Sequence, residues 1–532
     1  MVTGYLLKIL LLTGKLAEPL VRAAIDTCPS SYEISVFVMP IDVASLATPR
    51  SIASYLRKIK LEDYDLIMVS GAIQGSMKPV EDALGIKVVK GPKHAVDIPM
   101  LLNTYDPRRL SPDLPADTIL IKEIRDYAEK ILKKTETSIA SKPHIEVDGL
   151  LIPVDPPPIR VISEVTEAHL LSEDELIRTV RRRIEEGADI LGLGFQAGVA
   201  NPEKVKNFVK LIKREFDFPL VLDSIIPSEI VAGVEAGADM VMSLEAGNIR
   251  KVADKIQRIP AVVIPYDSRR GFFARDVEDK LRLLEMNLKT AFEHNVKNLI
   301  ADPVLEPINL SGSTGTFQSL MAYWMFKRER PEIPLLMGLC NVAELIDADS
   351  IGVNALLTML AAEIEASLVL VVEKSVKTMG STAEAKIAAQ MATIAREKRI
   401  PPKDLGLNLL IFKDKRKVET RLNLNGAVIV EADEKNGEYP RDPVGFFTIK
   451  VNHKDGRIEV LYSGVKGKIL IRGRRASSIY KEILRRRLLS ELSHALYLGV
   501  ELGKAEDALR TGKSYVQEES LFEQTRPIDI SK

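Results

Sequence analysis

The amino-acid sequence predicts an α/β protein organised around a central (β/α)8 barrel at residues 159–400. Short apolar segments alternate there with amphipathic helical patterns, for instance at 174–186, 201–215 and 277–294. A continuous apolar run is typical of a parallel strand buried on both faces. Eight βα units in about 240 residues match the size of a closed barrel. We expect the strands at residues 159–165, 190–195, 220–224, 240–244, 261–266, 299–304, 335–341 and 368–374.

A repeated tripeptide supports the same fold. Gly-Ala-Asp occurs at residues 187–189 and again at 237–239, both times between a predicted helix and the next strand. Glycine readily adopts the left-handed conformation that ends many helices. The repeat therefore predicts that helices end at Gly187 and Gly237.

Composition limits the classes of function. The chain has 532 residues, enough for about three domains. Lys plus Arg and Asp plus Glu number 74 each, which argues against a general binder of nucleic acid or anionic membranes. Cys28 and Cys340 fall in different predicted domains, so we expect no disulfide framework and a cytoplasmic location. The apolar run at residues 5–13 carries Lys8 and predicts a strand, not a signal peptide or a membrane span.

Residues 1–135 predict a separate α/β domain of Rossmann-like or flavodoxin-like type. Strands are expected at 6–12, 33–38, 66–69 and 87–89, and small residues follow three of them, at 13–15, 70–72 and 91–93. Ligands of open parallel sheets bind at such strand ends. Tight turns explain the same glycines, so both readings stay open. The Gly14-Lys15 pair lacks the spacing of a P-loop.

A connecting segment and a smaller domain flank the barrel. Residues 136–158 form a linker that ends in three prolines, which predict a stiff, extended spacer, and 149–154 is expected to pair against the bottom of the barrel. Residues 401–532 predict an α+β module. Its strands are expected at 427–431, 445–452, 457–462 and 468–471, its helices at 477–499 and 500–509. The basic run 485–487 indicates a solvated face more readily than an anion site.

The chemistry of a (β/α)8 barrel lies at the carboxyl ends of its strands. In this chain those ends carry carboxylates, amides, hydroxyls and one lysine. In strand order they are Glu164 and Thr166, Gly194 and Gln196, Asp223 and Ser224, Ser243 and Glu245, Tyr266 and Asp267, Asp302 and Glu306, Gly338 and Asn341, and Glu373 and Lys374.

These residue types exclude some chemistries and favour another. His169 is the one histidine near the predicted mouth, so neither a histidine-based zinc site nor a Ser-His-Asp triad is expected, and we predict no metal. Carboxylates with Asn and Lys suit a heterocycle with amide edges. An inward aspartate can accept two parallel hydrogen bonds, from a ring N–H and the adjacent exocyclic amine of an amino-pyrimidinone. Each acidic residue taken singly could instead be a structural cap.

Four stretches resemble the pterin-binding barrel family, which contains dihydropteroate synthase and methyltransferases that use methyltetrahydrofolate or methyltetrahydromethanopterin. They are Gly-Ala-Asp-Ile before strand 2, Val-Leu-Asp-Ser at 221–224, Ala-Asp-Pro at 301–303 and Met-Gly-Leu-Cys-Asn at 337–341. The order of the three domains, and the tail motif at 494–499, are similar to archaeal dihydropteroate synthase-related proteins. The resemblance spans nearly the whole chain.

The resemblance assigns roles to individual residues. Asp302 matches the carboxylate that binds the pterin N3–H and 2-amino group, and Asp223 matches a second aspartate facing the ring. Asn341 matches an asparagine near the pterin N5, and it is our candidate catalytic residue. We also expect the pterin to be lined by Ser243, Gln196 and Lys374.

Differences from dihydropteroate synthase indicate which of the family's reactions to expect. Glu164 stands where a pyrophosphate-binding loop begins in that enzyme, and its negative charge would repel the anion. Gly192 replaces an Asp, and Ser243 replaces an Asn for which Asn248 is a stand-in. The segments 339–341 and 373–375 lack the usual cations that would stabilise a departing pyrophosphate. The preferred hypothesis is therefore an enzyme that binds a reduced pterin, of folate or tetrahydromethanopterin type, and transfers its N5-methyl group.

Two alternatives remain at this point. One is dihydropteroate synthase itself, with Lys374 and the 311–315 helix start as its anion site, although that segment is more simply a helix cap. The other is a non-catalytic pterin-binding or assembly protein. Methyl transfer requires an acceptor, a corrinoid or thiol, from another domain or a partner protein such as a corrinoid methyltransferase. The sequence does not decide the oligomeric state, for which a homodimer is one option.

Overall fold

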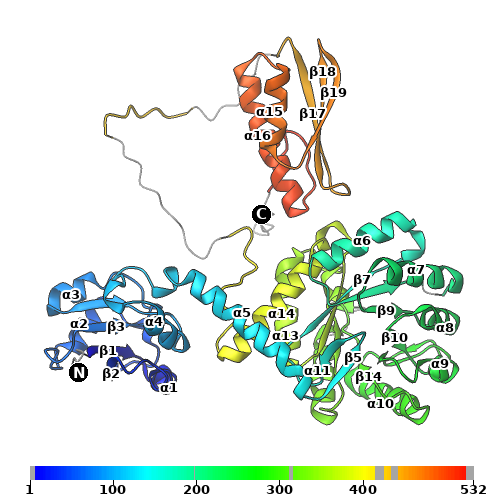
Figure 1. The fold of residues 1–532 in the computed structure, drawn as a ribbon, viewed down its shortest axis with the longest axis horizontal. Helices are drawn as coiled ribbons and strands as arrows, with labels where there is room; N and C mark the ends of the chain where they lie inside the picture. The colour runs from blue at the N-terminus through cyan, green and yellow to red at the C-terminus, as the bar shows by residue number, and fades with distance from the viewer. Residues whose placement is uncertain (1–5, 197, 311–314, 414–424, 433–440, 523–532) are drawn as a thin grey trace, which may run out of the picture.

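The computed structural model describes residues 6–522, apart from 197, 311–314, 414–424 and 433–440. Figure 1 shows three units along the chain: an N-terminal sheet domain, a barrel, and a C-terminal module of strands and helices. The fold class predicted from the sequence is confirmed in its central element, the (β/α)8 barrel.

The N-terminal unit is a four-stranded parallel sheet with strand order β2-β1-β3-β4. Alternate residues of the central strand enter two separate cores, Ile9 and Leu11 on one face and Leu10 and Leu12 on the other. Helices therefore cover both faces, as in other open parallel sheets. The elements are β1 (Leu7–Thr13), α1 (Glu18–Ile25), β2 (Tyr32–Val38), α2 (Pro49–Leu56), β3 (Leu66–Val69), α3 (Lys78–Leu84), β4 (Lys87–Lys90) and α4 (Ile98–Thr104).

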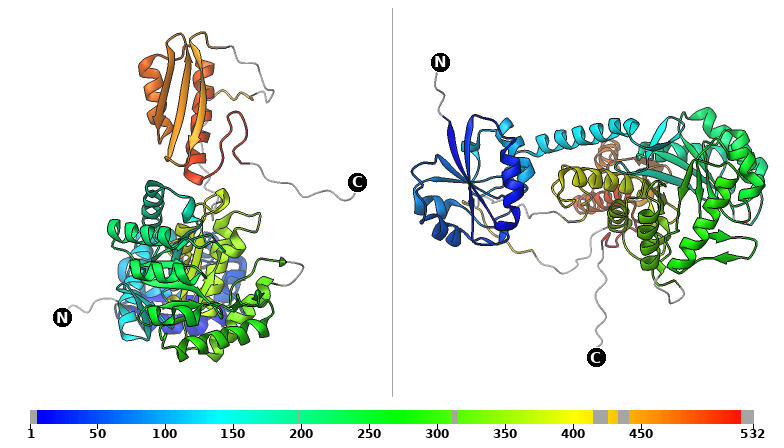
Figure 2. Two further views of the ribbon diagram at one scale, coloured as in Figure 1. Left: turned by 90° about the vertical axis from the view of Figure 1, so that its right-hand side faces the viewer. Right: turned by 90° about the horizontal axis from the view of Figure 1, so that it is seen from below.

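Helix α5 (Ile121–Ser138) runs from the N-terminal sheet to the barrel, as the right-hand view of Figure 2 shows. It crosses the domain boundary that we expected at residue 135. After it, β5 (His144–Val147) and β6 (Leu150–Pro153) pair as an antiparallel hairpin. Ile145 and Ile152 of the hairpin pack among the first residues of the barrel strands. The prediction that 149–154 pairs against the bottom of the barrel is thus confirmed.

The barrel contains eight parallel strands in the order β14-β11-β10-β9-β8-β7-β16-β15. A bridge between Ala301 and Leu335 joins the two outer strands and closes the ring. The strands are β7 (Arg160–Val165), β8 (Ile190–Gly194), β9 (Leu220–Asp223), β10 (Met240–Leu244), β11 (Ala261–Val263), β14 (Leu299–Ala301), β15 (Leu336–Gly338) and β16 (Leu368–Val372). The surrounding helices are α6 (Glu173–Glu185), α7 (Pro202–Glu215), α8 (Pro227–Ala236), α9 (Ile249–Ile256), α10 (Val277–Glu293), α11 (Gly315–Glu329), α13 (Ser350–Ile364) and α14 (Ser381–Lys398).

The repeated Gly-Ala-Asp has the expected role. Gly187 and Gly237 both have left-handed φ angles, of 97° and 109°. The motif's aspartates add a function that the pattern did not reveal, because each accepts a backbone N–H from the start of a strand. Asp189 accepts from Val161 at 2.9 Å, and Asp239 accepts from Leu220 at 2.9 Å.

Three barrel strands, β11, β14 and β15, end three residues earlier than predicted. Strand β11 stops at Val263, because Pro265 has no N–H to donate to a ladder. The next residues form an antiparallel hairpin of β12 (Tyr266–Asp267) and β13 (Phe272–Phe273). Strand β15 stops at Gly338, and the short helix α12 (Cys340–Ala343) follows it. Asn341 therefore lies on a helical turn and not on a strand.

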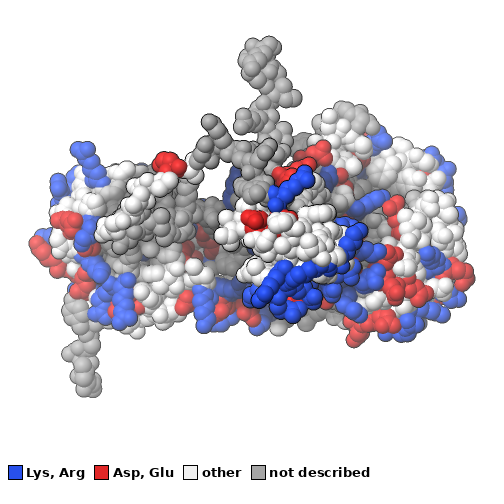
Figure 3. Space-filling view, turned by 90° about the horizontal axis from the view of Figure 1, so that it is seen from above, with Lys and Arg blue, Asp and Glu red and all other residues white. Residues whose placement is uncertain are grey.

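The C-terminal module packs two helices on one face of an antiparallel sheet. The strands are β17 (Gly445–Asn452), β18 (Arg457–Gly464) and β19 (Gly467–Gly473), and the helices are α15 (Ala476–Arg486) and α16 (Leu492–Thr511). Residues 427–431 form no strand, contrary to our expectation. The helix predicted at 477–499 is broken at Arg487, whose φ is 51°, and α16 includes the predicted 500–509 helix. Lys and Arg side chains gather where this module faces the viewer in Figure 3.

A buried ion pair joins the N-terminal unit to the barrel. The Lys398 ammonium lies 2.6 Å from an Asp97 carboxylate oxygen, and both side chains are almost fully buried. Removing one partner leaves the other charge buried and unpaired, which costs about 3–5 kcal/mol. We expect Asp97→Ala to unfold at a clearly lower urea concentration than the parent protein. The double variant Asp97→Leu/Lys398→Met should recover most of the loss, and equal unfolding midpoints for Asp97→Ala and the parent would contradict this role.

No helix among the described residues is both long and apolar enough to cross a membrane.

Candidate functional site

Three acidic side chains lie at the carboxyl ends of barrel strands, next to the apolar interior of the barrel. Ile162, Val221 and Ile300 belong to the core inside the ring. Side chains in a strand alternate between its two faces, so the residue two positions later points the same way. Those residues are Glu164, Asp223 and Asp302. The carboxyl end of the barrel therefore has acidic groups from β7, β9 and the end of β14.

Asp302 is buried, with 9% of its surface exposed. Its Oδ1 accepts a hydrogen bond from the Val304 N–H at 2.7 Å and another from the Tyr323 hydroxyl of α11. No described residue donates to Oδ2. Burial raises the pKa of Asp302 to about 6, against the opposing effect of these hydrogen bonds and of the Lys280 ammonium. Oδ2 is thus the oxygen left for a ligand.

Two side chains hold the loop after Asp302 in place by hydrogen bonds to its carbonyl groups. The fully buried Lys280 ammonium donates to the carbonyls of Pro303 and Val304 at 3.1 and 3.0 Å. The Asn341 side-chain amide donates to the Leu305 carbonyl at 2.9 Å. Val304 adopts a φ of 64°, which is rare for a β-branched residue and is held only by its surroundings. These contacts fix the direction in which Asp302 points.

Asp223 is held by Ser243 of the neighbouring strand. The Ser243 hydroxyl donates to Asp223 Oδ1 at 2.5 Å, and Ser243 itself has a left-handed φ of 70°. Burial raises the pKa of the Asp223 carboxyl. Among the described residues nothing donates to Oδ2 of Asp223. Ser243 therefore positions an aspartate, while its sequence position alone indicated a ligand contact.

Glu164 is a site residue that the sequence placed at a strand end, where the family resemblance gave it no role in binding the pterin. It is 8% exposed, and its carboxyl group has no hydrogen bond among the described residues. Gly192 and Gly194 on the adjacent strand make room for it, since a Cβ at Gly192 would lie 2.9 Å from Glu164 Cβ and one at Gly194 would overlap the carboxyl oxygen. This Gly-x-Gly pairing was the sequence signal for an inward Glu164.

The environment of Glu164 keeps it protonated at neutral pH. Burial and the negative charge of Asp223 raise the pKa of Glu164 to about 8. Burial, together with the neighbouring carboxyl groups of Glu164 and Asp302, also raises the pKa of the Cys340 thiol above its ordinary value. Cys340 is therefore a neutral thiol and no thiolate nucleophile.

Burial of these acids makes the unbound protein less stable as pH rises. Glu164 titrates near 4.5 when exposed and near 8 in the fold, so the folded state holds an extra proton between those values. Stability then falls as pH increases through that window. One pKa unit is about 1.4 kcal/mol, so the effect is on the order of a few kcal/mol. We expect the thermal midpoint to fall between pH 5 and about 8, and Glu164→Gln to reduce that fall; an unaltered pH dependence in the variant would rule out the shifted Glu164.

Two hydrogen bonds set the orientation of the Asn341 side-chain amide. Its amide nitrogen is engaged by the Leu305 carbonyl, and the Cys340 thiol is a weak donor to Oδ1, with Sγ 3.7 Å away. Turning the amide over would break the Leu305 bond. The side chain is therefore set as an acceptor.

Other predicted site residues lie apart from this cluster. Gln196 is exposed. Lys374 is also exposed, and its ammonium lies 3.2 Å from Glu167. Glu373 has a fully buried side chain that turns away to Arg182 and Thr382. Of the 311–315 segment, residues 311–314 lie outside the described residues. In the part of the chain that the structure describes, no three His, Cys, Asp or Glu side chains are grouped to hold a metal ion.

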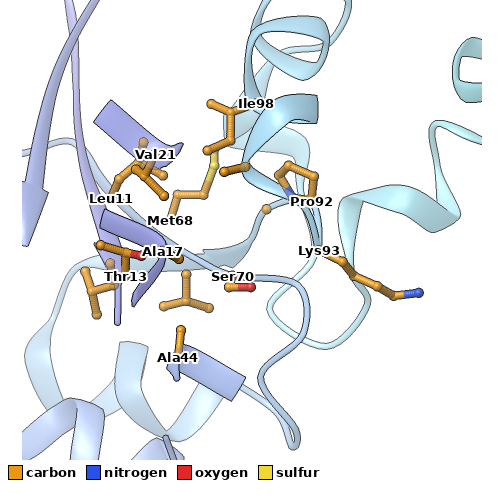
Figure 4. A pocket seen from close by; sticks show the side chains of 14 residues that line it. Leu11, Thr13, Ala17, Val21, Ala44, Met68, Ser70, Pro92, Lys93 and Ile98 are labelled. Carbon is orange, nitrogen blue, oxygen red and sulfur yellow. The ribbon is translucent and has the colours of Figure 1, made fainter. Parts of the chain in front are cut away.

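A separate small cavity occurs in the N-terminal sheet, where small residues at strand ends indicated either turns or a cleft. It has a volume of about 70 Å³ at the ends of β1, β3 and β4, with Thr13, Ser70 and Gly91 among its lining residues (Figure 4). Its other walls are mostly apolar, and Lys93 extends away to Asp404. For comparison, an engineered apolar cavity of about 150 Å³ binds benzene, so this cavity has about half of that volume.

The fold and these side chains define a (β/α)8-barrel protein with an acidic mouth that accepts hydrogen bonds. Residues 163–400 match the family described as pterin binding enzyme. Residues 441–518 match the family PterinBD-DUF4346, and residues 7–93 match a family of unknown function, DUF6513.

A relative matches over the whole length. The uncharacterized protein MJ0107 of Methanocaldococcus jannaschii is 36% identical over 530 residues, covering 97% of this chain and 99% of that protein. The chain belongs to the pterin-binding barrel family, together with this relative.

Solved structures with similar barrels include dihydropteroate synthases. The Xanthomonas albilineans enzyme with indole-2-carboxylic acid and 6-chloroguanine is 22% identical, with a TM-score of 0.38, and covers 47% of this chain and 95% of its own. The Yersinia pestis enzyme with a sulfonamide drug is 17% identical, with a TM-score of 0.39, and covers 48% of this chain and 99% of its own.

Proposed function

We propose that the barrel binds a reduced pterin, of folate or tetrahydromethanopterin type, and transfers its N5-methyl group. The amino-pyrimidinone edge of a pterin offers N–H donors, and Asp302 Oδ2 and Asp223 Oδ2 are acceptors to which no described residue donates. Their other oxygens are already occupied, by Val304 and Tyr323 in one case and by Ser243 in the other. Each carboxylate is therefore held in place with one oxygen directed to a ligand.

The observation that carries the proposal is the buried Glu164 carboxyl group, which has no hydrogen bond among the described residues and lies beside Asp223. When a methyl group leaves N5 for an attacking acceptor, the C–N bonding electrons remain on N5, and a proton there makes the leaving nitrogen a neutral amine. Glu164, with a pKa of about 8, holds a proton to give at neutral pH. The Asn341 carbonyl can accept a hydrogen bond from the N5–H that results. The acceptor of the methyl group would be a corrinoid or thiol carried by a partner.

The same charges speak against the synthase reaction. Dihydropteroate synthase releases pyrophosphate, which needs cations where the negative charge develops. Here the mouth carries acidic groups, Lys374 is exposed and paired with Glu167, and Lys280 is buried beneath the loop. An anionic leaving group would approach three carboxyls.

Calorimetry with a pair of ligands tests the proposal. We expect N5-methyl tetrahydropterins to bind, and 6-hydroxymethyl-dihydropterin to bind at least as tightly as its pyrophosphate ester. The two ligands differ only in the anionic group, so the ratio of their dissociation constants reports the charge of the mouth. If the pyrophosphate ester binds about tenfold more tightly than the alcohol, the synthase reaction is favoured. A tenfold ratio of affinities corresponds to the free energy of one favourable charge contact.

A further inference from the structure

The C-terminal module is strongly basic within a chain that is neutral overall. Residues 441–518 contain 16 Lys and Arg against 9 Asp and Glu, a net charge of +7, while the whole chain has 74 of each. The positive charge gathers on the face that Figure 3 shows. Such a field attracts anionic groups.

Part of this charge lines a cleft between the module and the barrel. The cleft has a volume of about 340 Å³ and is lined by Arg178 of α6 together with Lys454, Asp455, Arg457, Glu459 and Arg472 of the module. An ion pair between Lys454 and Glu175, at 2.6 Å, holds its two walls together. In Figure 1 the ends of β17 and β18 come down toward α6. The volume is within the range of small-molecule sites.

Two arginines of the cleft have no counterion within the described part of the chain. Arg472 pairs with Glu459 at 3.1 Å, and Asp455 accepts from Asn452. Arg178 and Arg457 make no ion pair or side-chain hydrogen bond among the described residues, and both are exposed. Guanidinium groups recognise carboxylates and phosphates through bidentate hydrogen bonds.

The cleft lies on the side of the barrel that carries the acidic mouth. Barrel helices run back along the strands, so their first turns lie near the carboxyl ends. Helix α6 starts at Glu173, eight residues after β7 ends at Val165, and Arg178 is in its second turn. The loop between them connects Glu164 to this helix.

We propose that the cleft binds the anionic tail of the pterin substrate, whose carboxylates or phosphate extend out of the mouth over the loop at 166–172. This inference rests on the proposed function of the barrel. It gives the two charge distributions complementary roles, because the acidic mouth receives the neutral ring and the basic cleft receives the charged tail. Arg178 and Arg457 would contact the tail directly.

The test compares ligands and variants of the full chain by calorimetry. The probes are 6-methyltetrahydropterin, which has no tail, tetrahydrofolate with one and with several glutamates, and tetrahydromethanopterin with its phosphate-bearing tail. We expect multiply charged tails to tighten binding about five- to tenfold at low salt, the scale of two exposed ion pairs. The gain should vanish at about 1 M salt, where the Debye length is roughly 3 Å. Glutamate and phosphate arms show which anion the cleft prefers.

Two double variants distinguish binding of the tail in the cleft from a general effect of positive charge on affinity. Arg178→Gln/Arg457→Gln should bind all tails like the tail-less pterin and leave that pterin's affinity unchanged. The matched control Arg181→Gln/Lys468→Gln removes the same charge from α6 and from β19 outside the cleft, and it should keep the tail effect. Equal affinities of tailed and tail-less pterins for the parent protein, or equal losses in both double variants, would overturn the inference while the barrel proposal stands. Failure of every pterin to bind would overturn both.

Discussion

Replacing Asn341 with alanine should slow methyl transfer from an N5-methyl pterin by about 10²-fold or more, the usual scale for one preorganised polar group in a transition state. The amide is fixed by the Leu305 carbonyl, so its Oδ1 is ready to accept from N5–H without reorganising. Ground-state binding should weaken less, because the two aspartates remain. Single-turnover rates and calorimetry measure the two effects separately.

A loop variant controls for the structural role of Asn341. The same side chain also fastens the loop that follows Asp302, so a slower rate could arise from a loosened loop. Ser319→Ala removes another fastening of that loop, the hydrogen bond from the Glu306 N–H to the Ser319 hydroxyl at 3.1 Å, without touching the mouth. We expect the Ser319 variant to keep most of the rate. Equal losses of the methyl-transfer rate in both variants would show that Asn341 acts only by holding the loop in place.

Asp302→Asn should weaken pterin binding by roughly 2–4 kcal/mol, the cost of losing a charged hydrogen bond inside a closed site. The structure also predicts how the amide is oriented. Val304 N–H and the Tyr323 hydroxyl both donate to Oδ1, so the amide oxygen will take that position. The NH2 group then replaces Oδ2 and meets the donors of the pterin edge. Two donors would face each other where the parent has an acceptor.

Tyr323→Phe provides the matched control for Asp302. It removes a donor to Oδ1 and leaves Oδ2 and its charge, so binding should weaken far less, by about the 0.5–1.5 kcal/mol of one hydrogen bond. Calorimetry at a pH above 7 compares each variant with the parent protein, whose Asp302 is ionised there because its pKa is about 6. Unchanged pterin affinity in Asp302→Asn would remove this residue from the binding site.

The barrel could be predicted because its signal is repeated along the chain. Eight apolar segments alternate with helices, and the period-2 geometry of strands then directs Asp223 and Asp302 inward from the core residues Val221 and Ile300. Glu164 follows the same rule from Ile162. Its significance emerged only with its neighbours, since the space left by Gly192 and Gly194 on the adjacent strand is a tertiary property.

Positions beyond the last strand residue were harder to predict. Strand β16 ends at Val372, so the alternation no longer fixes Lys374, and the loop turns it to Glu167. Gln196 lies two residues after Gly194 and is exposed for the same reason. The break at Arg487 in the C-terminal module had no proline or glycine to mark it. An arginine takes the left-handed cap position there, while Leu488 packs into the core.

One measurement tests the central claim most directly: a single-turnover assay with the full chain, an N5-methyl tetrahydropterin of either type, and a reduced corrinoid. We predict that the methyl group moves from N5 to the corrinoid and that the demethylated pterin appears in equal amount. The parallel assay supplies a dihydropterin pyrophosphate and an aryl amine, and we predict no pteroate. Pteroate formation without methyl transfer would contradict the account and assign the barrel to the synthase reaction.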